Sequence, residues 1–490
     1  MKPSKENIEH IRKQFTNMAC QAEFVELLNY AKHLIIGDKF EKFEIKQLTY
    51  YANPEVSGMR YHQFEIRKKD GNKRVINAPI KELKLIQQCL NLVLQCVFTP
   101  HSAATGFVNE KSIVENARVH ANRQFVYNID LKDFFLSIDQ ARVWKCLQLQ
   151  PFNLGLKSQM LSATRLEEID VLSKAVFIDM SKIYPGDKDE NIHGWSLLLK
   201  NYLEDVSNSD HYTALKRLKV SFAKVAHSQN KLTLVENTSK WWNHMPISRV
   251  HIASTIAYLA CTEMEVERLV DGKWERVKRN VLPQGSPVSP VLTNIVCQRL
   301  DFLLTGAAKR FGLKYTRYAD DITFSSNKNK FQNNGEFINE LQRILREQHF
   351  HIKETKTRLQ QTFYRQEVTG LIVNKGVNVA QAYIKQLRMW LYYWERYGYD
   401  RAYALFLPAY FAKRLKPIKG NPNMANVIAG KLDYLKMVKG ADNPMFMKLQ
   451  QRFDNLTTEH VTVNKILDIW ERDGIDKAME IFYQHQVATA

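Results

Sequence analysis

Long apolar runs are missing from this sequence, and none reaches the roughly eighteen residues that a membrane-spanning helix needs. The first stretch, MKPSKENIEHIRKQF, is polar and lacks the apolar core of a secretion signal. Cysteine is scarce: there are six in 490 residues and no closely spaced C-x-x-C pair, so neither a zinc site nor a disulfide framework is indicated. Internal repeats and Gly/Ser linkers are also absent. These absences predict a soluble, cytoplasmic protein with no membrane partner.

Acidic residues are too few to balance the basic ones. Fifty-one Asp plus Glu stand against seventy Lys plus Arg, which gives a net charge of +19. The excess is spread along the chain instead of forming one tail, and this indicates a polyanionic partner. Apolar residues make up 45% of the sequence, so a chain of this length can bury a core in about two to four domains.

Apolar spacing predicts the elements of the first part of the chain. Helical spacing runs through residues 4–50, and residues 64–80 (FEIRKKDGNKRVINAPI) predict two strands joined by a turn at Asp70-Gly71. A helix follows the second strand. The segment FVYNIDLKDFFLSID begins as a strand that ends near Asp130.

The second part of the chain alternates between polar and compact patterns. Residues 153–246 are polar and mostly helical, and are interpreted as an insertion. The stretch IASTIAYLACTEMEVERLV, residues 252–270, predicts a helix. Beyond residue 376 the chain is helical and basic, and residues 401–420 contain five Lys or Arg and no acid. This last segment is interpreted as facing nucleic acid; the alternative is that its aromatic residues belong to a helical core and its cations to a solvated face.

Two adjacent aspartates, Asp320 and Asp321, lie between two short apolar runs in YTRYADDITFSS. An isolated Asp-Asp pair is most simply a solvated turn. Here a third carboxylate, Asp130, stands where another predicted strand ends. Two divalent ions about 4 Å apart, clamping the oxygens of an in-line phosphoryl transfer, need several carboxylate ligands on rigid backbone. The combination therefore favours a metal site.

Taken in order, the motifs resemble those of reverse transcriptases, and within them the bacterial retron-type and defence-associated branch. KKDGNKRVINAP and LKLIQQCL resemble the fingers motifs, NIDLKDFFLSID motif A, LPQGSPVSPVLTN motif B, YADD motif C and HIKETKT motif D. NARVH (Asn116–His120) and VTG (Val368–Gly370) are similar to two patterns associated with retron enzymes. The insertion between motifs A and B is larger than is usual for plain retron enzymes.

This resemblance implies an α+β right-hand polymerase with fingers, palm and thumb. The expected parts are an N-terminal helical region (1–54), fingers (55–110), palm with motif A (111–152), a helical insertion in the palm (153–246), palm with motifs B, C and D (247–377), and a helical thumb with the C-terminal region (378–490).

The resemblance also assigns the chemistry of the site. Asp130, Asp320 and Asp321, with the carbonyl of Leu131, are expected to hold two Mg²⁺ ions. Lys356 of motif D is expected to protonate the departing pyrophosphate, a surface lysine being the alternative.

Further residues are assigned to the incoming dNTP. Lys73 and Arg74 follow the predicted turn and can meet a triphosphate, with a solvated hairpin as the alternative. Phe135 can lie beneath the sugar and collide with a 2′-hydroxyl, unless it is a core residue like its neighbour Phe134. In motif B, Gln284 and Gly285 are assigned to the nucleotide, Gly285 because it lets backbone approach a template base. An ordinary loop before a helix is the alternative for this glycine.

Five residues are assigned to RNA. Asn116 and His120 belong to the retron-like pattern, although a lone His is more often a satisfied structural group. Lys413, Arg414 and Lys416 lie in the basic C-terminal segment, where they alternate with aromatic residues.

The function predicted in this way is RNA-directed DNA synthesis from a cognate structured noncoding RNA, with cDNA as product and a role in antiphage defence. Priming and oligomeric state, including a homo-oligomer assembled with RNA, stay open. Two alternatives remain: a mobile-element enzyme of the group II intron type, and an RNA-binding scaffold with a vestigial polymerase site. No H-N-H nuclease pattern supports the first, and the complete set of three aspartates argues against the second.

Overall fold

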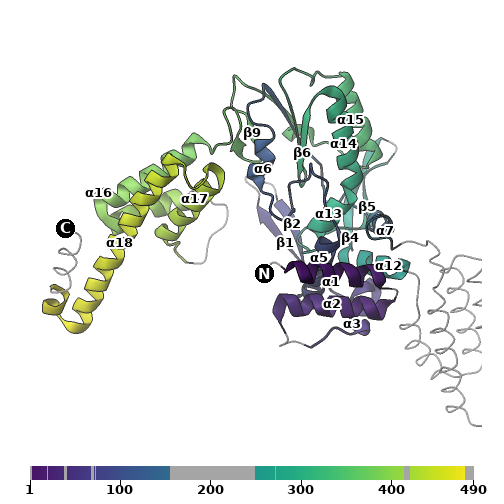
Figure 1. The fold of residues 1–490 in the computed structure, drawn as a ribbon, viewed down its shortest axis with the longest axis horizontal. Helices are drawn as coiled ribbons and strands as arrows, with labels where there is room; N and C mark the ends of the chain where they lie inside the picture. The colour runs from purple at the N-terminus through teal and green to yellow at the C-terminus, as the bar shows by residue number, and fades with distance from the viewer. Residues whose placement is uncertain are drawn as a thin grey trace, which may run out of the picture.

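The fold is that of a computed structural model (Figure 1), which describes residues 3–18, 20–37, 41–67, 71, 73–154, 249–270, 272–412 and 420–479. The predicted insertion, apart from its first two residues, lies outside the described residues. So do Lys413, Arg414 and Lys416.

A four-stranded antiparallel sheet forms the centre of the molecule, in the order β6-β7-β3-β8. Its strands are β3 (Phe125–Asp130), β6 (Lys314–Tyr318), β7 (Asp321–Ser326) and β8 (Arg358–Gln361). The predicted strand ending near Asp130 and the hairpin around the Asp pair are confirmed. Strand β3 pairs with β7 so that Asp130 stands opposite Asp321.

Alternation along these strands buries both faces of the sheet. On one face, Phe324 of β7 stacks on Tyr315 of β6 with ring centroids 5.0 Å apart and meets the edge of Phe337 at 4.9 Å. Phe337 belongs to the helix pair that covers this face, α14 (Gln298–Phe311) and α15 (Glu336–Glu347). The opposite face carries α6 (Ile113–Arg118), which packs near β6.

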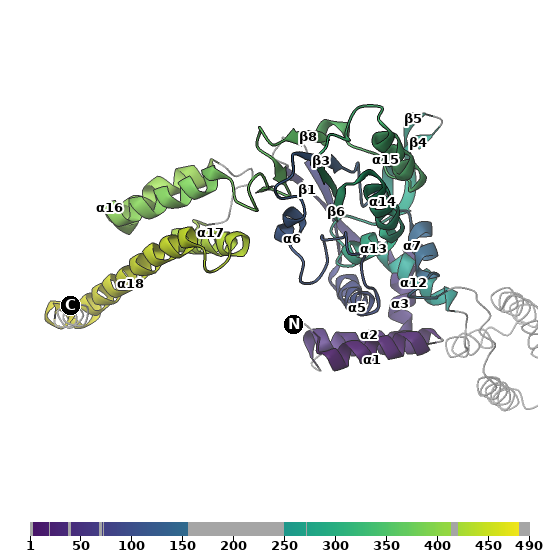
Figure 2. The ribbon, with the colours of Figure 1, turned by 45° about the horizontal axis from the view of Figure 1, so that its top comes forward.

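Helices form a base beside the sheet, with α1 and α2 packed on α5 and with α12 packed on α3 and α7 (Figures 1 and 2). Their bounds are α1 Lys5–Asn17, α2 Gln21–Ile36, α3 Ile45–Ala52, α4 Pro54–Ser57, α5 Lys81–Val97, α7 Gln140–Leu147, α12 Val250–Ala260 and α13 Ser289–Val296. The prediction of helices in residues 4–50 is confirmed. None of the described helices has the length and apolar content that a bilayer crossing requires.

Two further hairpins flank the site. The first, β1 (Tyr61–Arg67) with β2 (Lys73–Pro79), confirms the strands predicted in residues 64–80. The second, β4 (Thr262–Val270) with β5 (Lys273–Val281), contradicts the helix predicted over residues 252–270, because α12 already ends at Ala260. In TEMEVERLV, alternate residues face opposite sides of the hairpin, and that period of two prevails over the helical spacing before it.

The C-terminal part is helical, as predicted, and stands beside the rest of the molecule (Figure 1). It contains α16 (Gln381–Phe411), which bends at Gly398, followed by α17 (Met424–Lys439) and α18 (Pro444–Asp473). These helices share a second core that also takes in Val126 of β3. The short helix η1 (Glu354–Lys356) precedes β8, and the strand pair β9 (Glu367–Val368) and β10 (Leu371–Ile372) connects β8 to α16.

Candidate active site

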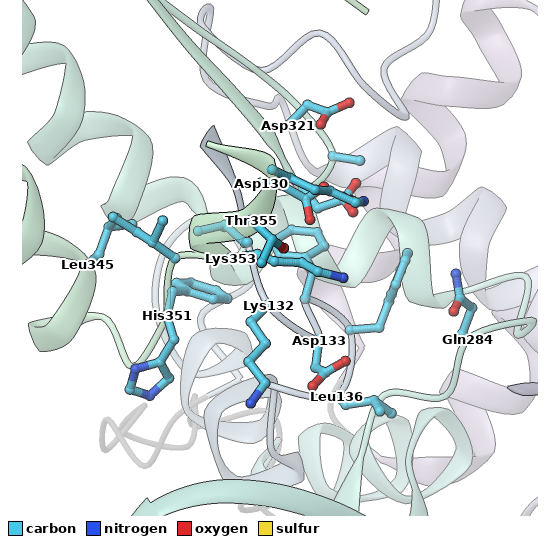
Figure 3. Close-up of a pocket in the computed structure, with 18 of the residues that line it drawn as sticks. Asp130, Lys132, Asp133, Leu136, Gln284, Asp321, Leu345, His351, Lys353 and Thr355 are labelled. Carbon is cyan, nitrogen blue, oxygen red and sulfur yellow. The ribbon is translucent and has the colours of Figure 1, made fainter. Parts of the chain in front are cut away.

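The three predicted carboxylates meet at one end of the central sheet. Asp130 ends β3, Asp321 begins β7 directly opposite, and Asp320 occupies the turn before it. The amide of Leu131 donates to the carbonyl of Asp320 at 3.2 Å, and that of Lys353 to the carbonyl of Asp130 at 2.8 Å. Asp130, Asp320 and Asp321 all line a cavity of about 1230 Å³ (Figure 3).

A buried arginine holds the turn that carries the aspartate pair. Arg317 is 0% exposed and forms a bidentate pair with Asp301, with nitrogen–oxygen distances of 2.8 and 2.7 Å. The same guanidinium donates to the carbonyl of Ala319 at 3.2 Å. Ala319 has a φ of 57°, a left-handed conformation that non-glycine residues adopt only when their surroundings enforce it. Arg317 therefore fixes the backbone directly before Asp320.

Close packing against Gly106 supports the same turn from another side. A Cβ at Gly106 would lie 2.5 Å from the amide nitrogen of Ala319, so only glycine fits there. The carbonyl of Gly106 accepts from the side-chain amide of Asn294 at 3.0 Å, and Asn294 accepts from Arg317 at 3.1 Å. One buried network thus connects motif B to the carboxylate turn.

The carboxylates repel one another electrostatically. Desolvation raises the pKa of Asp320, and the charge of Asp130 raises it further. Desolvation and the charges of Asp320 and Asp130 raise the pKa of Asp321 to about 7. Asp321 nevertheless keeps contact with solvent at the mouth of the cavity. Excess negative charge of this kind favours binding of a cation.

One lysine partly offsets this charge. The Nζ atom of Lys356 lies 3.1 Å from Asp130 Oδ1, while half of the lysine side chain remains exposed. The structure therefore brings this predicted residue into the site, where it contacts a carboxylate directly.

The donor chemistry fits a hard divalent cation, which prefers carboxylate and carbonyl oxygens. The three aspartates supply such oxygens from adjacent strands and one turn. Among the described residues, however, no three acid, histidine or cysteine side chains are gathered into a closed metal-binding group.

Several residues predicted for the nucleotide line the same cavity, as Gln284 does across from His351 in Figure 3. They are Lys73, Arg74, Leu131, Phe135 and Gln284. Phe135 is half-buried and lies 6.2 Å from the ring of Phe107, whereas Phe134 is 3% exposed and fills the core as expected. Lys73 also pairs with Glu65 at 2.7 Å on the exposed hairpin.

Gly285 packs closely against strand β2. Its φ is 122°, and a Cβ there would lie 2.7 Å from the carbonyl oxygen of Asn77 and 2.8 Å from Cγ2 of Ile76. The close approach that glycine permits is therefore to strand β2. The predicted approach of a template base to this glycine stays a prediction.

The structure contradicts the predicted RNA contacts of Asn116 and His120. Both side chains are 0% exposed. His120 contacts the hydroxyls of Ser325 and Thr316 at 2.7 Å each, and burial lowers its pKa to about 3, so the ring is neutral. Asn116 accepts from Thr105 at 2.9 Å and donates to Thr369 of the VTG segment at 3.4 Å. The two retron-like patterns thus meet as packing partners behind the sheet.

The β4–β5 hairpin brings residues to the site that the sequence reasoning missed. Trp274 lines the cavity, and the Nζ atom of Lys132 stands 3.5 Å from its ring centroid. Lys132 also pairs with Glu267 at 2.8 Å, and Trp274 meets the ring of His351 at 4.8 Å. The alternating pattern of residues 262–270 was the available signal, because it predicts a strand.

In the C-terminal helices, two aromatic residues near the predicted RNA-binding cations pack against the second core. Tyr403 and Tyr410 are partly buried against the second core, beside the buried Phe406. This agrees with the alternative interpretation for these rings. Arg401 is exposed.

Comparisons with known proteins agree with the motif analysis. The family described as "Reverse transcriptase (RNA-dependent DNA polymerase)" matches residues 218–375, a range that contains Asp320, Asp321 and Lys356. A match to this family supports a right-hand polymerase fold, and reverse transcriptases in general depend on divalent metal ions.

Among curated proteins, the retron Mx162 reverse transcriptase of Myxococcus xanthus is 27% identical over 360 residues, which cover 70% of this chain and 55% of that protein. The retron Ec86 reverse transcriptase of Escherichia coli is 35% identical over 112 residues, or 22% of this chain and 34% of that protein. The chain thus spans little more than half the length of the Mx162 enzyme. A solved telomerase from Candida albicans aligns with 94% of this chain and 71% of its own length, at 10% identity and with a TM-score of 0.35. The predicted similarity to retron reverse transcriptases is confirmed.

Proposed function

Because the chain carries a reverse transcriptase domain and is similar to retron reverse transcriptases, we propose that it is an RNA-directed DNA polymerase. One observation carries this proposal: Asp130, Asp320 and Asp321 meet on adjacent strands inside a cavity large enough for a nucleotide. In this proposal the central sheet is the palm, the β1–β2 hairpin belongs to the fingers, and α16 to α18 form the thumb.

The three aspartates and the carbonyl of Leu131 are the groups that would hold two Mg²⁺ ions. Such ions stabilise the charge that develops on the attacking and leaving oxygens during in-line phosphoryl transfer. The protein contributes the rigidity of the ligands. Strand pairing places Asp130 opposite Asp321, and the Arg317 network holds the turn that carries Asp320.

The cavity walls supply the contacts for a dNTP. Lys73 and Arg74 present cations from β2 toward the triphosphate. Phe135 gives the apolar surface against which a 2′-hydroxyl would collide. Lys356 holds a proton on Nζ beside Asp130, from which it can protonate the departing pyrophosphate.

The template in this proposal is a cognate structured noncoding RNA, and the product is its cDNA. The net charge of +19 supports a nucleic-acid partner. Similarity to retron enzymes supports RNA as that partner, and the resemblance to defence-associated relatives extends the proposal to antiphage defence.

The test is incorporation of labelled dNTP by the purified protein with its co-purifying RNA, in Mg²⁺ and in EDTA. We expect RNase-sensitive incorporation in Mg²⁺ and none in EDTA. Equal labelling under both conditions, or none when Mg²⁺ and a primed RNA template are supplied, would contradict the proposal and leave an RNA-binding scaffold as the function.

A further inference from the structure

Two aromatic side chains stand almost fully in solvent on the turn that follows β8. Phe363 is 95% exposed and Tyr364 is 75% exposed. Large exposed rings side by side are uncommon on soluble proteins unless they serve a binding site. Neither residue belongs to the cavity with the three aspartates.

The turn is held firmly in place. The amide of Thr362 donates to the carbonyl of Gln124 at 2.9 Å, which ties the turn to the start of β3. The side-chain amide of Asn374 donates to the carbonyls of Thr362 at 3.1 Å and Tyr364 at 2.8 Å. The rings are therefore displayed on a fixed backbone, which lowers the entropy cost of binding a partner.

The surroundings of the rings are basic. Four neighbouring loops are joined here by hydrogen bonds: residues 122–124, 327–330, 361–366 and 374–376. We call them together the basic end of the sheet. These loops contain five Lys or Arg and no Asp or Glu, the five being Arg123, Lys328, Lys330, Arg365 and Lys375.

The five cations differ in their partners and in their exposure to solvent. Arg365 pairs with Glu367, just outside the loops, at 2.7 Å. The Nε atom of Arg123 is buried and has no hydrogen-bond partner within the described part of the chain. Lys328, Lys330 and Lys375 are exposed. The basic end therefore offers positive charge that the described residues largely leave uncompensated.

We propose that the basic end is a binding site for an unpaired stretch of RNA, with Phe363 and Tyr364 stacking on bases and the surrounding cations meeting phosphates. Aromatic rings combined with cations are the common composition of single-strand sites. Lysine is depleted at protein–protein interfaces, which makes a protein the weaker candidate. Bases in a duplex have their faces covered, so the rings require a loop or a tail.

The site is separate from the catalytic carboxylates but shares their scaffold. Phe125, at the start of β3, pairs with Gln361 at the edge of the turn, and Asp130 ends the same strand. Six residues of strand place the two ends about 17 Å apart. Figure 1 shows β9, which follows the turn, on the side of the sheet nearest to α16. This inference rests on the proposed function, which supplies RNA as the partner.

The test compares two fluorescent RNA hairpins with equal numbers of phosphates: one with an unpaired tail of about eight nucleotides, the other blunt. Binding to the full chain is measured by anisotropy. For Phe363→Ala/Tyr364→Ala we expect affinity for the tailed RNA to fall about tenfold or more and affinity for the blunt RNA to stay unchanged. Phe363→Trp/Tyr364→Trp should keep the affinity, because indole rings also stack. Phe302→Ala is the matched control, because Phe302 is also exposed, at 59%, but lies on α14.

The cations give an independent readout. Neutralising Lys328 and Lys375 to Gln should reduce the slope of log affinity against log salt by about 0.7 for each cation that meets a phosphate of the unpaired tail. Unchanged affinity of the alanine pair for the tailed RNA, or an equal loss on both RNAs, would overturn the inference and favour a protein as occupant.

Failure of this inference is distinguishable from failure of the proposed function. Wild-type incorporation of dTTP on poly(rA) primed with oligo(dT) tests synthesis alone. If wild type synthesises DNA while the alanine pair binds the tailed RNA normally, only the site at the basic end is overturned.

Discussion

The two ends of strand β3 differ in charge, burial and support. At one end Asp130 is 8% exposed and lies near two further carboxylates. The pKa values of Asp320 and Asp321 are raised by desolvation and by the charge of neighbouring carboxylates. At the other end the charged residues of the adjoining loops are all Lys or Arg, and Phe363 is 95% exposed. One rigid strand thus carries both the proposed catalytic site, at its acidic end, and the proposed RNA site, at its basic end, each on the turns where the sheet ends.

The supports of the two ends differ in a way that predicts their tolerance to change. The acidic turn is held by Arg317, a fully buried cation whose loss leaves Asp301 as a buried unpaired charge. The basic turn is held by the neutral amide of Asn374 near solvent. Substitutions at the acidic end should therefore impair DNA synthesis, whereas those at the basic end should weaken RNA binding and leave the protein folded.

The largest expected effect is the loss of DNA synthesis when two carboxylates of the acidic end are replaced. Asp320→Asn/Asp321→Asn keeps the side-chain shape but removes two anionic ligands, so dTTP incorporation on poly(rA)–oligo(dT) should fall about a thousandfold or more. Affinity for the tailed RNA should not change, because its proposed site lies at the other end of β3. A double variant with normal synthesis would remove the catalytic assignment.

A smaller loss of activity should follow from weakening the buried contacts of Arg317. Arg317→Lys keeps the charge but cannot form the bidentate pair and still reach the carbonyl of Ala319. Misplacement of the Asp320 turn should lower kcat about 10- to 100-fold, with little change in KM for dTTP.

The matched control for the support is Arg343→Lys, an exposed arginine on α15 paired with Glu340. It should leave kcat unchanged, since exposed ion pairs contribute little. If both variants retain wild-type kcat and similar thermal stability, Arg317 does not position the turn.

Nucleotide selection gives the next effect. Phe135→Val shortens the wall of the cavity while Phe134 keeps its place in the core. Discrimination between dTTP and UTP, measured as the ratio of their kcat/KM values, should relax about tenfold or more. An unchanged ratio would assign Phe135 to packing alone.

The smallest effect is on stability. Asp321 has a pKa raised to about 7 from an ordinary 3.8, so the metal-free folded protein loses stability as pH rises through that interval. Asp321→Asn cannot ionise. In EDTA its melting temperature should exceed that of wild type by at most a few degrees above pH 7, because solvent screens this exposed group, and should match it below about pH 4.

Asp433→Asn, an exposed position on α17, is the control for this melting series. Adding Mg²⁺ should raise the melting temperature of wild type more than that of Asp321→Asn, since a bound cation stabilises the folded state. A pH-independent difference between wild type and Asp321→Asn would contradict the crowded-carboxylate account.

The sequence predicted the acidic end well because its signals are local. Two short strands, one Asp pair and one strand-ending Asp are readable from alternation and motif order. Lys356 was also predicted, and it does contact Asp130. What sequence could not show is the Arg317–Asp301 pair, because two charges sixteen positions apart on a strand and a helix give no local signal of shared burial.

Burial of two polar side chains explains why their predicted RNA contacts were wrong. His120 and Asn116 carry polar side chains that look available for RNA, but the packing of the α6 segment on the sheet buries both. At Gly285, only the fold shows that the backbone of Asn77 comes close to the glycine. The basic end was missed because its cations come from four loops spread between residues 122 and 376.

RNA-directed DNA synthesis at the three carboxylates is tested most directly by sequencing the nucleic acid that co-purifies with the protein from cells. The comparison is between wild type and Asp320→Asn/Asp321→Asn. Wild type should carry an RNA together with DNA complementary to part of it. The double variant should carry the same RNA without the DNA, because binding survives when the acidic end is disabled. Complementary DNA on both proteins, or RNA without DNA on wild type, would contradict RNA-directed DNA synthesis at these carboxylates.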